Sequence, residues 1–342
     1  MIHNPLVSII IPVFNVRPYL VEALDSIIAQ SYDNLEIIII DDGSTDGSGL
    51  ICDQYAIKDS RIRVIHQKNR GLSSARNVGL DIMRGDVVAF VDSDDAIHPD
   101  YVRNMLTAMI RENVDMVLCK CIIHNTTGPM RYKRRERNIP VIEAGKYGHD
   151  DTLRSLIAGK INVAVWNKLY RSELWKNVRF PDGHVYEDID TTFRIINICN
   201  DIYVLDLPLY YYRRRPGSIT GTITRENISD KDRAYAHYEA FVRDHVPKVF
   251  TKVQLNRFSQ ARLNCMIADY SKSVRSTQKI DDAFQNELSR RAMAYGKNAG
   301  IDSFRLRTKV AYYVLSSCPW ILQLIFPLYY SIRMAVWKIT GR

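Results

Sequence analysis

The chain has 342 residues, enough for one large α/β domain with a smaller appendage or for two ordinary domains. Hydrophobic residues make up 46% of it and charged residues 25%, which excludes a globally disordered chain. The net charge of +9 suits an anionic partner such as a nucleotide, a phospholipid surface or a nucleic acid, and it does not choose among them.

The first third of the chain alternates strand and helix patterns. Continuous apolar runs predict strands buried on both faces, and apolar residues at helical spacing predict the helices between them. The predicted strands are 7–11, 35–40, 63–66 and 87–91, and the predicted helices are 19–30, 50–56 and 73–83. This alternation with short connections predicts an α/β fold with a mostly parallel, doubly wound sheet.

Ligands of such sheets bind beyond the carboxyl ends of the strands. The four loops that follow the predicted strands are all polar, and two of them are rich in carboxylates. These loops are 12–15, 41–48, 67–76 and 92–95. Because four strand ends converge on one edge of the sheet, we expect the loops to form a single binding crevice.

The six cysteines indicate a reducing compartment. They form no Cys-x-x-Cys pair, and no set of Cys and His residues has zinc spacing. Cys119 and Cys121 alternate with their neighbours in an apolar run, as side chains on one face of a strand do. We interpret the cysteines as buried thiols of a cytoplasmic chain, and we expect no signal peptide because the N-terminus lacks its pattern.

The acidic residues after the fourth strand indicate a cation site. Asp92, Ser93, Asp94 and Asp95 place three carboxylates within four residues, and these repel one another unless a cation is bound. Magnesium typically takes one or two carboxylates together with substrate phosphates. The alternative is an Asp-rich turn that caps the helix after Pro99.

The loop 41–48 reads Asp-Asp-Gly-Ser-Thr-Asp-Gly-Ser and follows the second strand. It turns at its glycines and offers carboxylates to the N–H groups of a base or to ribose hydroxyls. The alternative is a helix N-cap with a turn, for which Ser44 or Asp46 is suited. No G-x-G-x-x-G pattern occurs, so a dinucleotide-binding fold lacks its fingerprint.

Beyond Thr224 the chain becomes helical, with helices predicted at 234–246 and 253–272. Residues 310–332 contain no charged side chain, cations flank them on both sides, and two prolines interrupt them. We expect this segment to lie on an anionic membrane surface, with a core helix or a true span as the alternatives. The basic run 130–137 is predicted to be a surface loop or hairpin, with a membrane or substrate contact as its alternative.

The motifs of the first two-thirds occur in a family-specific order. They are Pro12 to Asn15, Asp41 to Asp46, Asn69 to Asn77 and Asp92 to Asp95. Together they resemble the successive motifs of the family 2 inverting glycosyltransferases of the GT-A fold, found in bacterial polysaccharide gene clusters. The resemblance runs from about Pro5 to about Thr220. It implies a catalytic domain over 1–225, whereas the residue patterns described above predict a helical region over 226–305 and a membrane-associating segment over 306–342.

The resemblance implies binding roles for matching residues. Those expected around the nucleotide base and ribose are Pro12, Val13, Asn15, Asp41, Asp42 and Arg76. Asp92 and Asp94 are the expected Asp-x-Asp pair with Ser93 between them. Asp94 or Asp95 is expected nearest the Mg²⁺ or Mn²⁺ that bridges the donor diphosphate. The segment 211–219 is expected to close over the donor phosphates, with Arg213 and Arg214 as fork-like donors.

The resemblance also implies a catalytic base. Glu187 and Asp188 match the Glu-Asp motif of the family, in which the aspartate takes the proton of the acceptor hydroxyl, and residues 166–170 (Trp-Asn-Lys-Leu-Tyr) precede it as in relatives. Inverting transfer is an in-line attack on the anomeric carbon, so it needs one such base. It also needs a cation to neutralise the departing diphosphate.

Three other functions compete with this interpretation. A nucleotidyltransferase would carry a glycine-rich, basic loop after its first strand, where this chain has Pro12 to Asn15. A non-catalytic nucleotide-sugar or lipid-surface binding protein need not keep Asp92, Asp94 and Asp188. A nucleic-acid-binding protein would cluster its basic residues, which are scattered here. The resemblance implies transfer from a UDP-sugar to a glycan or lipid-linked glycan, and we expect it at the inner face of the cytoplasmic membrane and without a nucleic-acid partner.

Overall fold

A computed structural model describes residues 4–125, 128, 130, 142–215, 224–249, 252–275 and 281–317. The chain forms two compact units. The first comprises residues 1–156, 160–221 and 230–245, and the second comprises 157–159, 222–229 and 246–342.

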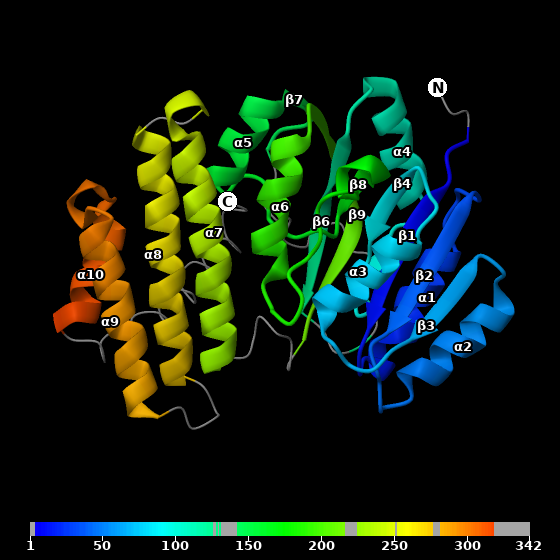
Figure 1. The fold of residues 1–342 in the computed structure, drawn as a ribbon, viewed down its shortest axis with the longest axis horizontal. Helices are drawn as coiled ribbons and strands as arrows, with labels where there is room; N and C mark the ends of the chain where they lie inside the picture. Colours follow the sequence, from blue (N-terminus) through cyan, green and yellow to red (C-terminus); the bar gives the residue numbers. More distant parts are fainter. Residues whose placement is uncertain are drawn as a thin grey trace, which may run out of the picture. The chain divides into compact units, whose positions relative to one another are not determined.

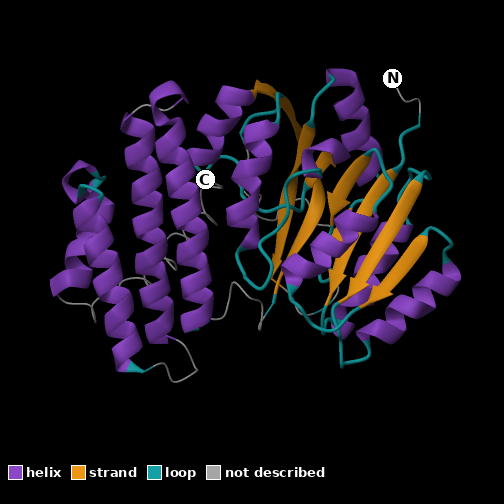
Figure 2. Cartoon of the chain, viewed as in Figure 1, coloured by secondary structure: helices purple, strands orange, loops and turns teal. Residues whose placement is uncertain are grey.

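The first unit is built on a mixed sheet that contains nine strands within the described residues (Figures 1 and 2). The strands are β1 (Val7–Val13), β2 (Leu35–Asp41), β3 (Ile62–His66), β4 (Val87–Phe90), β5 (Ala96–Ile97), β6 (Met116–Asn125), β7 (Gly145–Gly148), β8 (Lys168–Arg171) and β9 (Asp201–Arg214). Their order is β3-β2-β1-β4-β8-β6-β9-β5, and β7 pairs with β9. Strands β1 to β4 are mutually parallel, whereas β8 runs antiparallel to β4 and β6.

Helices pack on both faces of this sheet (Figure 1). In this unit they are α1 (Arg17–Ile28), α2 (Ser48–Lys58), α3 (Leu72–Ile82), α4 (Tyr101–Glu112), α5 (His149–Ile157), α6 (Glu187–Ile198) and most of α7 (Arg225–Val249), with a 3₁₀ turn at Ser172–Trp175. Ile9 and Ile11 face a core shared with α1, α2 and α4. Ile10 faces Gly79 of α3 on the opposite side. Alternate residues of β1 are therefore buried by different layers, as its uninterrupted apolar run predicts.

A buried acid fixes the amino ends of the central strands. Glu36 of β2 accepts hydrogen bonds from Ser8 Oγ of β1 and from the backbone N–H groups of Arg84 and Gly85, just before β4. Burial raises the pKa of Glu36, but these hydrogen bonds outweigh it and the pKa is lowered overall. The carboxylate therefore ties three neighbouring strands together at the end of the sheet away from the expected binding loops.

The second unit is helical. Its elements are α8 (Lys252–Arg275), α9 (Asp282–Asn298), a 3₁₀ turn at Ile301–Ser303 and α10 (Leu306–Ser317). They enclose their own core around Leu263, Ile267, Leu288 and Leu315. No described helix of the protein is long and apolar enough to cross a membrane.

The expected elements are all present. Each predicted strand and helix of the first third overlaps an observed one, and 234–246 and 253–272 lie within α7 and α8. Cys119 and Cys121 share one buried core, as predicted, whereas Cys265 is only partly buried. Met130 is buried, and the rest of the basic run 130–137 lies outside the described residues. Of the uncharged segment 310–332, only 310–317 is described, and it belongs to α10.

Gly85 should be essential for the packing of the amino ends. A Cβ added there would lie 2.4 Å from Ser8 Oγ and 2.7 Å from Ser8 N. We expect Gly85→Ala to lower the free energy of unfolding by about 1–3 kcal/mol, the usual cost of overpacking, measured by urea denaturation. Gly148→Ala is the control, because its Cβ would meet only Asp201 Oδ1 at 3.7 Å. Equal denaturation midpoints for the two variants would contradict this packing.

Candidate active site

Contacts within the first unit join the loops at the carboxyl edge of the sheet. Asn15 after β1 accepts a hydrogen bond from Thr45 N after β2 at 2.8 Å, and Asn15 N donates to Ser44 Oγ at 3.1 Å. Asp42 after β2 contacts the loop after β3, and Arg76 in that same stretch contacts Asp92 after β4. The four polar loops therefore meet at one edge, as the sequence predicted.

Asp41 and Asp42 organise the loops around them. Asp41 accepts a hydrogen bond from Ser44 N at 3.1 Å, and its other oxygen lies 2.8 Å from His66 Nδ1. Asp42 accepts hydrogen bonds from Gln67 Nε2, Arg70 N and Gly71 N at 2.7–2.8 Å. Both side chains are buried, so their expected contacts with base and ribose stay predictions.

The N-cap of α2 is Gly47, so the expectation of Ser44 or Asp46 at that position is wrong, and Asp46 instead connects two helices. Its carboxylate accepts hydrogen bonds from Ser48 N and from Arg17 N, each at 2.9 Å, and so joins the first turns of α1 and α2. Burial raises the pKa of Asp46, but these hydrogen bonds and that of the Ser48 hydroxyl lower it overall. Pro12 and Val13 are buried in β1 itself, just before the loop.

Arg76 occupies the centre of the edge and is almost fully buried. Its guanidinium pairs with Asp92 through Nη2 at 2.7 Å and with Glu187 through Nη1, and it lies 5.4 Å above the ring of Phe180. Burial opposes its charge, but the two carboxylates raise its pKa. The expected contact of Arg76 with base or ribose does not fit this geometry, because its charged group is enclosed by protein carboxylates.

The Glu-Asp pair stands at the first turn of α6. Glu187 is buried against Arg76, whereas Asp188 is partly exposed and accepts a hydrogen bond from Ile189 N at 2.8 Å. Burial and the neighbouring Glu187 raise the pKa of Asp188 to about 7, although Arg76 acts in the opposite direction. A carboxyl that titrates near neutral pH suits general base catalysis.

Asp92 and Asp94 differ from Asp95 in exposure. The side chains of Asp92 and Asp94 are 25% and 19% exposed. One oxygen of each is paired with an arginine, Arg76 or Arg215, and the other makes no hydrogen bond to the described residues. Burial and the charge of Asp92 raise the pKa of Asp94, which is the repulsion expected for this sequence.

Asp95 is fully buried and both its oxygens are used. It accepts hydrogen bonds from Tyr210 Oη at 2.8 Å and from Arg213 N at 2.7 Å. Burial and the adjacent Asp94 and Asp92 raise its pKa well above the ordinary range. This carboxyl therefore ties β9 to the loop and is poorly suited to the metal contact expected of it. Within the described residues, no group of three or more His, Cys, Asp or Glu side chains is arranged to hold a metal.

The arginine run at the end of β9 has three different environments. Arg213 is buried, donates to the backbone oxygen of Asp94 at 2.8 Å and pairs with Glu22, so its expected phosphate contact does not fit. Arg214 is exposed. Arg215 Nε lies 2.6 Å from Asp94 Oδ2, and its Cζ lies 5.3 Å from the ring centroid of Tyr19. Alternation along a strand places residues 213 and 215 on the same side, a signal that could have identified Arg215.

Two further groups were missed by sequence reasoning. Trp166 stacks between Tyr210 and Tyr212, with ring centroids 4.7 and 5.0 Å apart. Lys168 is fully buried, and its Nζ donates to Asn162 Oδ1 at 2.6 Å. Burial lowers the pKa of Lys168 to about 7. Both belong to the Trp-Asn-Lys-Leu-Tyr segment, whose order gave no indication of these contacts.

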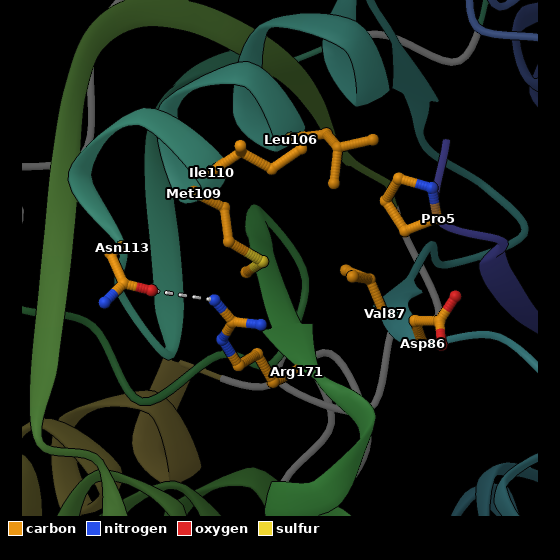
Figure 3. A pocket seen from close by; sticks show the side chains of 8 residues that line it. All are labelled: Pro5, Asp86, Val87, Leu106, Met109, Ile110, Asn113 and Arg171. Atoms are coloured by element: carbon orange, nitrogen blue, oxygen red, sulfur yellow. Dashed lines mark hydrogen bonds between the residues drawn. The ribbon is translucent and has the colours of Figure 1, made fainter. Parts of the chain in front are cut away.

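A cavity in the same unit lies elsewhere (Figure 3). It is lined by Pro5, Asp86, Val87, Leu106, Met109, Ile110, Asn113 and Arg171. Pro5 precedes β1 and Asp86 precedes β4, so the cavity lies at the amino ends of these parallel strands. Arg171 faces Asn113 in it, at 3.5 Å. The expected catalytic residues are not among its lining, so we place the active site at the carboxyl edge.

Known proteins resemble this chain in sequence and in fold. The profile of Glycosyl transferase family 2 matches residues 8–179. The chain is 31% identical to EpsH of Bacillus subtilis over 308 residues, covering 85% of this chain and 88% of EpsH. It is 34% identical over 235 residues to the glycosyltransferase GlyA of Streptococcus pneumoniae, covering 66% of this chain but only 33% of GlyA.

A solved structure supports the same assignment at the level of the fold. TarS 1-349 of S. aureus, crystallised with UDP-GlcNAc, matches with a TM-score of 0.54 and 20% identity, over 91% of this chain and 79% of that chain. The mixed, mostly parallel sheet with its helical C-terminal region is thus of the GT-A type that the motifs implied. With half of its length matched by the family profile, the chain belongs to glycosyltransferase family 2.

Proposed function

We propose that this glycosyltransferase moves a sugar, with inversion at the anomeric carbon, from a UDP-sugar to a hydroxyl of a glycan or lipid-linked glycan in polysaccharide biosynthesis. One observation carries the proposal: Arg76 bridges Asp92 and Glu187. This bridge supports the proposal because it joins Glu187, the neighbour of the proposed base Asp188, to the proposed cation ligand Asp92 through one buried guanidinium. In-line displacement needs a proton acceptor and a stabilised leaving group in such a fixed relation.

Asp188 is the proposed catalytic base. It is the partly exposed member of the Glu-Asp pair, whereas Glu187 is enclosed by its ion pair with Arg76. Its pKa of about 7 lets it be ionised at neutral pH and still accept a proton from an attacking hydroxyl. Glu187 then has a supporting role, because it holds Arg76 and raises the pKa of Asp188.

Asp92 and Asp94 are the proposed ligands of Mg²⁺ or Mn²⁺. Each has one carboxylate oxygen without a hydrogen bond to the described residues, and two carboxylates with substrate phosphates suit magnesium. A bound cation would neutralise the charge that develops on the departing diphosphate. Arg215, which pairs with Asp94, lies where it adds a second positive charge for the phosphates.

The donor and the acceptor are proposed at the level of chemical class. UDP-sugars are the first donors to test, because TarS, which shares the fold, was crystallised with UDP-GlcNAc. A lipid-linked acceptor agrees with a membrane-facing surface on the second unit. On α10, Leu306, Val310 and Tyr313 are 76%, 51% and 49% exposed. Their spacing places them on one side of the helix, opposite the buried Leu315.

We propose that this α10 stripe holds the enzyme to the inner face of the cytoplasmic membrane. Arg305 beside the stripe is exposed, and Lys309 is partly exposed. An apolar stripe with flanking cations is typical of helices that lie in the plane of an anionic leaflet. The uncharged residues 318–332 that motivated this expectation lie outside the described part of the chain.

Donor turnover should require a divalent cation held by Asp94. We expect chelator, or Asp94→Ala, to lower hydrolysis and transfer of the donor by about 10²-fold or more, since metal stabilisation is worth several kcal/mol. Asp302→Ala, at an exposed position in the second unit, is the control and should keep wild-type rates. Undiminished turnover in excess chelator would exclude the metal assignment.

Asp188→Asn should abolish transfer while donor binding, measured by calorimetry, stays unchanged. Loss of a general base costs about 10²- to 10⁴-fold, because the amide cannot accept the proton. In the wild type, kcat/KM should rise with pH through about 7 as Asp188 ionises. A variant with half the wild-type rate would move the base to Glu187.

The thermal stability of Asp188→Asn controls for loss of activity by unfolding. Because the pKa of Asp188 is raised, the folded protein binds this proton more tightly than the unfolded chain does. The contribution of Asp188 to the free energy of unfolding therefore falls as the pH rises from the ordinary pKa of an aspartate to about 7. Asp188→Asn has no such dependence. At pH 8 its melting temperature should therefore equal or exceed that of the wild type, and a lower one would attribute the lost activity to unfolding.

Substitutions on α10 should separate membrane binding from chemistry. We expect the double variant Leu306→Glu/Val310→Glu to bind anionic vesicles at least about tenfold more weakly, because burying each side chain contributes roughly 1.5–3 kcal/mol. Donor hydrolysis should be unchanged. Leu50→Glu/Ile57→Glu is the matched control, with two exposed apolar residues on α2. Equal vesicle sedimentation of the two double variants would exclude the α10 surface.

A further inference from the structure

Helix α7 contacts the segment that carries the Glu-Asp pair, although it lies beyond the part of the chain that the family profile matches. The profile ends at residue 179, and residues 230–245 of α7 pack within the first unit. The contacts fall on both sides of Asp188 along the chain. They are made by one face of α7, since positions 230, 233, 237, 238 and 241 follow helical spacing.

The segment before the base needs such support. Tyr186, the residue that precedes α6, has φ of 60°, a left-handed conformation that is uncommon for a side chain of this size. The Tyr186 side chain makes no capping hydrogen bond to α6. Backbone of this kind persists where neighbouring contacts hold it, and it is frequent at functional sites. The direction in which Asp188 leaves the backbone depends on this turn.

Asp230 holds the two residues that precede Tyr186. Its carboxylate lies 2.7 Å from His184 Nδ1 and accepts a hydrogen bond from Val185 N at 2.9 Å. The side chain of Asp230 is only 12% exposed. From the other side, Ser73 Oγ of α3 donates to the backbone oxygen of His184 at 3.2 Å. Residues 184 and 185 are therefore fixed between α7 and the helix that carries Arg76.

Two residues of α6 that follow the base also contact α7. Asp190 lies 3.0 Å from His237 Nδ1 and 3.7 Å from an Arg233 nitrogen. One turn further, Phe193 stacks on Tyr238 with ring centroids 5.0 Å apart and planes nearly parallel. The turn that presents Asp188 is thus held by α7 at residues before it and after it.

We propose that α7 is a structural part of the catalytic centre, with Asp230 as the positioning residue that fixes the approach of Asp188 to the acceptor. This proposal rests on the assignment of Asp188 as the base. The family profile ends at residue 179, whereas the α7 contacts lie at residues 230–241, so the proposal extends the functional unit of the enzyme by about 60 residues. A displacement of about 1 Å at a catalytic group costs on the order of 10²-fold in rate.

The test compares Asp230→Ala with Asp281→Ala. Asp281 accepts a hydrogen bond from Phe284 N at 2.7 Å and caps α9 in the second unit, so each variant loses a carboxylate that holds backbone N–H. Asp281 also pairs with Arg225, in the part of α7 that belongs to the second unit, so the control tests α7 away from residues 230–245. We expect Asp230→Ala to lower kcat for transfer by about 10- to 100-fold while the KM for donor stays within about twofold. Asp281→Ala should keep wild-type kcat. Asp230→Asn should recover most of the rate, because its amide oxygen still accepts from Val185 N.

Hydrogen exchange distinguishes this proposal from the proposed function. Amides of residues 185–190 should exchange faster in Asp230→Ala than in the wild type or Asp281→Ala, whichever substrate the enzyme uses. Unchanged exchange there, or equal kcat in the two alanine variants, would overturn the role of Asp230. A donor KM that rises in proportion to the fall in kcat would overturn it too, because the damage would not be confined to the base. Full activity of Asp188→Asn would instead overturn the base assignment and leave the exchange result standing.

Discussion

The ion pairs of Arg76 are the constraint on which the rest of the active edge depends. A guanidinium that is 2% exposed is unfavourable unless it is paired, and here Asp92 and Glu187 pair with it from two different parts of the chain. Removing Arg76 would leave the buried Glu187 carboxylate without its counter-charge, at a cost of about 3–5 kcal/mol. The bridge therefore fixes the loop after β4 and the start of α6 relative to α3.

Around this bridge, carboxylates of the same chemical type differ in burial and therefore in what they can do. Asp95 is fully enclosed and its raised pKa favours the neutral form, so it serves as a structural hydrogen-bonding group for β9. Asp188 is partly exposed and titrates near neutral pH. Asp92 and Asp94 each have one oxygen that makes no hydrogen bond to the described residues. Environments that push carboxyl pKa values apart are how one site provides both a base and a cation-binding group.

The sequence predicted the strands, the helices between them and the edge at which the polar loops meet, because these follow from local apolar patterns. It did not predict which polar side chains face inward. Arg76 and Glu187 are 111 residues apart, so their pairing depends on packing that no local pattern encodes. It also did not predict that Arg215 pairs with the Asp94 carboxylate while Arg213 pairs with Glu22. The contacts of α7 were also missed, because its polar residues resemble those of any solvent-facing helix.

Strand β9 ends in three tyrosines followed by three arginines, Tyr210 to Arg215. A slip of one residue would put the same residue type back into most of these positions, so composition alone specifies the register of this strand weakly. The observed register pairs Tyr211 with both Ala96 and Ile122. Asp95 also favours this register over a shifted one, because its carboxyl accepts hydrogen bonds from both the Tyr210 hydroxyl and the Arg213 backbone N–H. A residue next to the proposed cation ligands thus also helps to specify the register of β9.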